Sequence, residues 1–67
     1  RERLREVQAT LAALGPRVEL VFRKCRLDGL GQAAIARELG VSLSSVEKDL
    51  QKAYRALAQL RAKFDAE

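Results

Sequence analysis

The chain has 67 residues, a formal net charge of +4, one cysteine and no histidine. A chain of this length holds one domain, the lack of histidine excludes Ser–His and Cys–His catalytic pairs, and one cysteine cannot build a structural zinc site. No apolar run reaches the roughly 18 residues of a membrane span, the first residues are too charged for a signal peptide, and a lone thiol fits a reducing compartment, so we expect a cytoplasmic protein without membrane insertion.

Good helix formers dominate the composition, and the spacing of apolar residues predicts an all-α fold of four helices. The first covers residues 2–13. Gly15-Pro16 ends it, because glycine suits a helix end and proline suits the first turn of the next helix. The second is expected over residues 16–27, closed by the turn-forming pair Asp28-Gly29. The apolar stripes of these two helices are Leu4, Val7, Leu11 and Leu14, and Val18, Val21, Phe22 and Cys25.

The third predicted helix is short and the fourth is long. Residues 32–39 form the third, and Gly40 stands where a left-handed residue would end it. The fourth runs over residues 43–64 with Ser42 as its expected N-cap, a capping box starting at Ser44 being the alternative. Its apolar stripe is Val46, Leu50, Ala53, Leu57, Leu60 and Phe64. A helix of about 30 Å is longer than the other three can cover, so we expect its C-terminal end to project, fray or pack on a partner.

The stretch from Gln32 to Val46 has the layout of a helix-turn-helix, which we place at about residues 32–58. This motif needs a small residue where its helices cross, which Ala36 supplies, and a residue tolerant of positive φ in the turn, which Gly40 supplies. Val41 and Val46 hold the second helix against the first. A plain helical bundle is the alternative, but these residues at these spacings favour a motif whose second helix enters the major groove of DNA.

Polar and basic side chains occupy the predicted outward face of the fourth helix, whose flanks carry Glu47 and Asp49. Hydroxyl, amide and basic groups suit base edges and phosphates, although an ordinary solvated helix face is the alternative. We expect base contacts from Ser44, Ser45, Lys48 and Gln51, and phosphate or backbone contacts from Lys52, Arg55 and Arg37. Because much positive charge lies on the first two helices instead, we expect weak binding in isolation.

Several segments of the chain are similar to a known family. Leu14-Gly15-Pro16-Arg17, Val21-Phe22, Asp28-Gly29-Leu30 and the motif from Gln32 to Glu47 resemble region 4 of bacterial sigma-70 factors, most of all the extracytoplasmic-function group. The run from Ser44 to Lys48 is similar to members that control iron-siderophore uptake. The resemblance implies a domain that reads the −35 promoter element, packs on the β-subunit flap of core RNA polymerase and is held inactive by an anti-sigma factor.

Two positions depart from the family pattern. Gly31 stands where serine or threonine usually caps the third helix, and Ala34 stands where a carboxylate is common. Region 2, which reads the −10 element, is absent from these residues, so the resemblance implies that the chain alone cannot start transcription. Because the chain does not begin with Met, we expect it to be part of a longer protein.

Two other functions stay open. The effector domain of a LuxR-type response regulator has a similar motif, but its last helix is short and separate from the reading helix. A helical protein-interaction module that does not bind DNA is the second. An enzyme, a cofactor and a small-molecule substrate are not expected. The apolar stripe of the fourth helix extends further than the other helices are expected to cover. We therefore predict a partner surface for polymerase or an anti-sigma factor, formed in part by Leu57, Leu60, Phe64, Leu4 and Val7.

Overall fold

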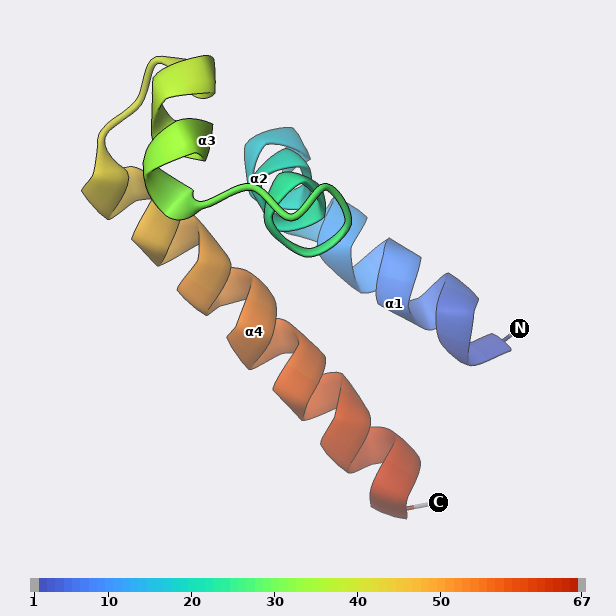
Figure 1. The fold of residues 1–67 in the computed structure, drawn as a ribbon. Coiled ribbons are helices and arrows are strands. Elements are labelled where there is room, and N and C mark those ends of the chain that lie inside the picture. Colours follow the sequence, from blue (N-terminus) through green and yellow to red (C-terminus); the bar gives the residue numbers. More distant parts are fainter. Residues whose placement is uncertain (1, 67) are drawn as a thin grey trace.

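The computed structural model describes residues 2–66, and these form four helices and no strand (Figure 1). The helices are α1 (Glu2–Ala13), α2 (Pro16–Arg26), α3 (Gln32–Leu39) and α4 (Leu43–Ala66). The all-α prediction is confirmed, and all four helices begin at the predicted residues. α2 ends one residue earlier than expected and α4 two residues later. The molecule measures 40 × 20 × 19 Å, because the 24 residues of α4 span its long dimension.

The turn between α1 and α2 depends on one glycine. Gly15 has φ 106° and ψ 157°, a conformation that side-chain-bearing L-residues rarely adopt. Pro16 follows in the first turn of α2, where its missing N–H costs no helical hydrogen bond. The Gly15 carbonyl accepts the first helical hydrogen bond, from the Glu19 N–H at 3.1 Å. The prediction that Gly15-Pro16 ends the first helix is therefore confirmed, and the same pair sets the residue at which α2 begins.

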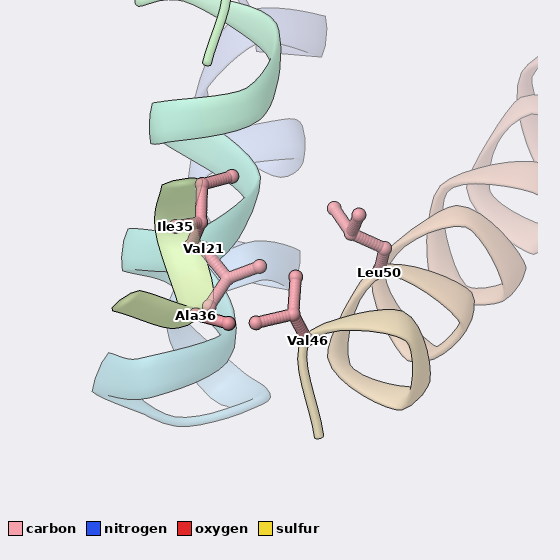
Figure 2. Packing of buried hydrophobic residues seen from close by; sticks show 5 residues of the cluster. All are labelled: Val21, Ile35, Ala36, Val46 and Leu50. Carbon is pink, nitrogen blue, oxygen red and sulfur yellow. The ribbon is translucent and has the colours of Figure 1, made fainter. Parts of the chain in front are cut away.

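One core cluster holds the first turns of α4 against α2 and α3. Figure 2 shows its side chains converging from the three helices, and the buried members are Val21, Ile35, Ala36, Val46 and Leu50. Cys25, Leu30, Leu39 and Val41 pack around them. Val21, Cys25, Val46 and Leu50 come from the predicted stripes, and Ala36 and Val41 from the predicted helix-turn-helix positions, so the burial of these residues is as expected.

A second core cluster lies further along α4. Its buried members are Leu11, Val18 and Ala53, one from each of α1, α2 and α4. Val7, Leu14, Phe22 and Leu57 pack against it. The Phe22 and Tyr54 rings meet edge to face, with centroids 6.0 Å apart. Tyr54 therefore packs against α2 from beside the inward stripe of α4.

The expected overhang of α4 is wrong, because α1 lies along its C-terminal half. In Figure 1 the first turn of α1 and the last turn of α4 lie at the same end of the molecule, and Lys63 Nζ is 3.0 Å from Glu6 Oε1. The Arg3 guanidinium carbon lies 4.9 Å from the centre of the Phe64 ring, a cation–π contact. The sequence did not reveal the direction of α1, and α1 running antiparallel to α4 supplies the missing cover. Within residues 2–66, no helix is both long and apolar enough to cross a membrane.

Candidate nucleic-acid interface

The turn between α3 and α4 has the geometry of a helix-turn-helix. Gly40 is left-handed, with φ 67° and ψ 34°, as predicted. Its N–H donates to the Arg37 carbonyl, and the Val41 N–H donates to the Ala36 carbonyl at 3.0 Å. These two bonds form a Schellman motif, which satisfies carbonyls at the end of α3 and reverses the chain within three residues. Val41 then packs on the core, so α4 leaves the turn in a fixed direction.

α4 is capped by Ser42, the first of the two predicted caps. The Ser42 Oγ accepts a hydrogen bond from the Ser45 N–H at 3.1 Å, and the two serine hydroxyls lie 3.0 Å apart. Ser45 is half-buried in this arrangement. Its hydroxyl therefore belongs to the cap, whereas Ser44 is exposed on the outer side of the same turn. Of the two serines expected to contact bases, only Ser44 is free to do so from this geometry.

An exposed polar face runs along the first four turns of α4, and we call it the reading face. Its members are Ser44, Lys48, Gln51, Lys52 and Arg55, all exposed. No ion pair within residues 2–66 engages Lys48, Lys52 or Arg55. Four acidic residues are instead paired elsewhere: Glu6, Glu38, Asp49 and Asp65. Because these three cations are not neutralised by neighbours, they are available to phosphates.

Arg37 and Glu47 are exposed, and Cys25 packs against the core. Arg37 is exposed on α3, beside a shallow depression that it lines with Ala34 and Glu38. Glu47 is exposed on the edge of the reading face. The described part of the chain holds no group of three potential metal ligands, and Cys25 is a half-buried free thiol packed against the first core cluster.

Asp49 is not on the surface of α4, so its predicted place on a flank of the outward face is wrong. It is 1 % exposed and is the only buried charged residue among residues 2–66. Its Oδ2 accepts from Arg17 Nε at 2.8 Å, and its Oδ1 accepts from Arg17 Nη2 at 3.2 Å. The signal was present, because Asp49 follows Val46 by three residues and precedes Ala53 by four. That spacing places it on the inward stripe.

The predicted partner residues divide between two places. Leu4 and Val7 line a groove of about 480 Å³ between α1 and α2, whose other apolar walls are Leu11, Phe22 and Leu27. Leu4 and Leu27 are 60 % and 73 % exposed. Leu57 packs on the second core cluster, and Leu60 and Phe64 are half-buried at the far end of α4. Val7 and Leu57 pack against the same core cluster, so the groove residues lie next to the C-terminal half of α4.

Comparison with known families gives one match. Residues 4–57 match the family model described as "Sigma-70, region 4". A search of curated proteins and a search of solved structures each found no match. The match covers most of α1, all of α2 and α3, and the part of α4 that carries the reading face. The chain therefore belongs to the sigma-70 region 4 family, whose helix-turn-helix takes part in promoter recognition with RNA polymerase.

Proposed function

We propose that this domain reads the −35 promoter element by inserting the start of α4 into the major groove, as part of a sigma factor of the extracytoplasmic-function group that directs transcription initiation in the bacterial cytoplasm. The observation that carries the proposal is the reading face itself. Three cations without an internal ion pair lie beside a free hydroxyl and a free amide, on a helix whose direction is fixed by the turn at Gly40. In this proposal Ser44, Lys48 and Gln51 contact bases, and Lys52 and Arg55 contact phosphates.

The remaining predicted contacts have smaller roles in this proposal. Arg37 contacts the DNA backbone from α3, and Ser45 acts through the cap that holds the first turn of α4. The resemblance of the run from Ser44 to Lys48 supports control of an iron-uptake regulon. Each of these refines the proposal, and none is needed for the test below.

The test is fluorescence-anisotropy binding of the domain to −35-like and scrambled duplexes over a salt series. We expect tighter binding to the −35-like duplex and loss of that preference in Lys48→Ala and Gln51→Ala. Arg61→Ala is the matched control, because Arg61 is an exposed cation on the same helix outside the reading face. Equal binding of both duplexes by the wild type, or no binding at low salt, would favour a protein-interaction module instead.

The polymerase contact that we propose uses the groove between α1 and α2. Its occupant is the β-subunit flap of core RNA polymerase, and the support is family membership together with two exposed leucines, Leu4 and Leu27, on the walls of one apolar groove. We expect Leu4→Glu to abolish binding of a purified flap segment. Leu20→Glu is the control, because Leu20 is 40 % exposed on α2 but does not line the groove. Equal binding by both variants would refute this site.

We further propose that an anti-sigma factor competes with polymerase, through a surface that includes Leu57, Leu60 and Phe64 beside the groove residues Leu4 and Val7. Half-burial of Leu60 and Phe64 supports a contribution from their outer edges. The test is Leu60→Glu, with binding of the flap segment and of a candidate anti-sigma domain measured separately. Unchanged binding of both would remove the end of α4 from the proposal.

A further inference from the structure

We infer that Arg17 and Asp49 are a positioning pair that sets the rotation of α4, and with it which bases the reading face can contact. The inference rests on the proposed reading of DNA by α4. Asp49 lies in the second turn of α4, one residue after Lys48 and two before Gln51. Any rotation of α4 that moves the Asp49 carboxylate therefore moves the base-reading side chains by the same angle.

The geometry of the pair is directional. Both carboxylate oxygens of Asp49 are held, one by Nε and the other by Nη2 of the same guanidinium. A two-point contact between planar groups fixes orientation as well as distance, which a single lysine contact does not. No buried polar side-chain atom among the described residues lacks a partner, and each Asp49 carboxylate oxygen accepts a hydrogen bond from Arg17.

The surrounding apolar contacts do not fix the rotation equally well. α4 meets α2 and α3 through Val46, Leu50 and Ala53, and apolar burial is non-directional. The anchor on the other side is better defined, because Arg17 follows Pro16 in the first turn of α2, just after the constrained Gly15. The pair thus connects a fixed point on α2 to the part of α4 that reads DNA.

Stability alone does not account for this pair. Moving a carboxylate out of water costs free energy that an ion pair often only balances, and an apolar residue of similar size frequently serves as well. Arg17 is also 53 % exposed, which weakens its attraction to Asp49 by solvent screening. Neutralisation has a second effect, since an unpaired carboxylate within the reading turns would repel phosphates. Orientation is the role that an apolar pair would not supply.

The test compares two affinities for each variant, because the fraction of folded protein changes both affinities equally and leaves their ratio unchanged. The ratio is that of the dissociation constants for scrambled and −35-like duplexes, measured at one salt concentration. For Asp49→Leu we expect a folded domain by circular dichroism, unchanged or tighter binding to the scrambled duplex, and a ratio lower by about tenfold, equivalent to one lost base contact. For Arg17→Lys, which keeps the charge but not the two-point contact, we expect a smaller fall in the same ratio.

Glu6→Gln is the matched control. It breaks another ion pair between α4 and a neighbouring helix, at Lys63, fourteen residues and about 21 Å beyond Asp49. We expect it to leave the ratio unchanged. If Arg17→Lys and Asp49→Leu both keep the wild-type ratio, the positioning role is refuted while the proposed function stands. If Asp49→Leu does not fold, Arg17→Lys decides alone. If the wild-type domain itself binds scrambled and −35-like duplexes equally, so that the ratio is one, both the proposed function and the positioning role are refuted.

Discussion

Gly31 and Gly40 flank the same short helix but meet different backbone demands. Gly31 precedes α3 with φ −72° and ψ 158°, a conformation open to every residue, whereas Gly40 follows it with φ 67°. A Cβ added at either position would meet no atom within 4 Å. Any difference between substitutions at these two glycines therefore comes from the backbone and from capping, not from steric clashes with neighbours.

Gly40→Ala should destabilise the domain by about 1 kcal/mol, because the left-handed conformation is unfavourable for a residue with a Cβ. Gly31→Ser is the matched variant and should stabilise by a few tenths of a kcal/mol, roughly the advantage of serine over glycine as an N-cap. Urea unfolding followed by circular dichroism measures both. If the two variants were equally stable, the turn would not depend on the conformation of Gly40.

For single residues, the sequence predicted backbone conformation and capping better than it predicted which side chains are buried. Gly40, Pro16 and Ser42 each have a local chemical reason for their position, and all three lie where predicted. Asp49 was misplaced because a charged residue is rarely buried without a partner, and its partner lies 32 positions away. Arg17 cannot be matched to Asp49 from spacing along the chain, since the contact forms only when α2 packs on α4.

The start of α4 combines a structural residue and a candidate reading residue in one turn. Ser42 caps the helix through the Ser45 N–H, and Ser44 points its side chain to solvent. Because the two serines are only two positions apart, the sequence alone does not show which one caps the helix and which one is free to contact DNA. The two serines therefore separate helix formation from DNA contact within a single element.

Ser42→Ala should cost about 1 kcal/mol of stability, because the Ser45 N–H loses its side-chain acceptor, the Ser42 Oγ, and keeps only the Ser42 carbonyl at 3.1 Å. Ser44→Ala should leave the thermal unfolding temperature unchanged and lower the preference for the −35-like duplex. Thermal unfolding and anisotropy titration on the same samples measure the two effects. A loss of stability in Ser44→Ala as large as that in Ser42→Ala would show that the cap is shared, contrary to the observed hydrogen bond.

The length of α4 was predictable and its surroundings were not. Regular apolar spacing to Phe64 indicated one unbroken helix, which the structure confirms and which favours a sigma domain over a LuxR-type effector. The same stripe was interpreted as uncovered because helix lengths say nothing of how helices are oriented. The antiparallel contact of α1, recorded by Glu6–Lys63 and Arg3–Phe64, supplies the cover.

Across the whole molecule, ion pairs decide which positive charges remain available. The net charge of +4 is modest, and Arg17, Lys24, Arg61 and Lys63 each have a carboxylate partner. Of the two carboxylates beside Lys48 in the sequence, Asp49 is directed inward and paired with Arg17, and Glu47 is exposed without an ion pair to the three cations of the reading face. Exposed arginines without an ion pair within residues 2–66 also lie on α1, α2 and α3, so the positive charge is spread as predicted: Arg5, Arg23, Arg26 and Arg37. On α4, three basic side chains without such an ion pair gather on the reading face.

This arrangement predicts a position-dependent salt effect. Each phosphate contact adds about 0.9 to the slope of log Kd against log salt concentration, because one condensed cation is released from the DNA. Lys52→Gln and Arg55→Gln should each lower that slope by about one unit, on −35-like and scrambled duplexes alike. Arg61→Gln changes the net charge by the same amount, but Arg61 faces Asp65 outside the reading face, so its slope should stay at the wild-type value. An equal fall in all three variants would mean that the domain binds DNA through its net charge and not through the reading face.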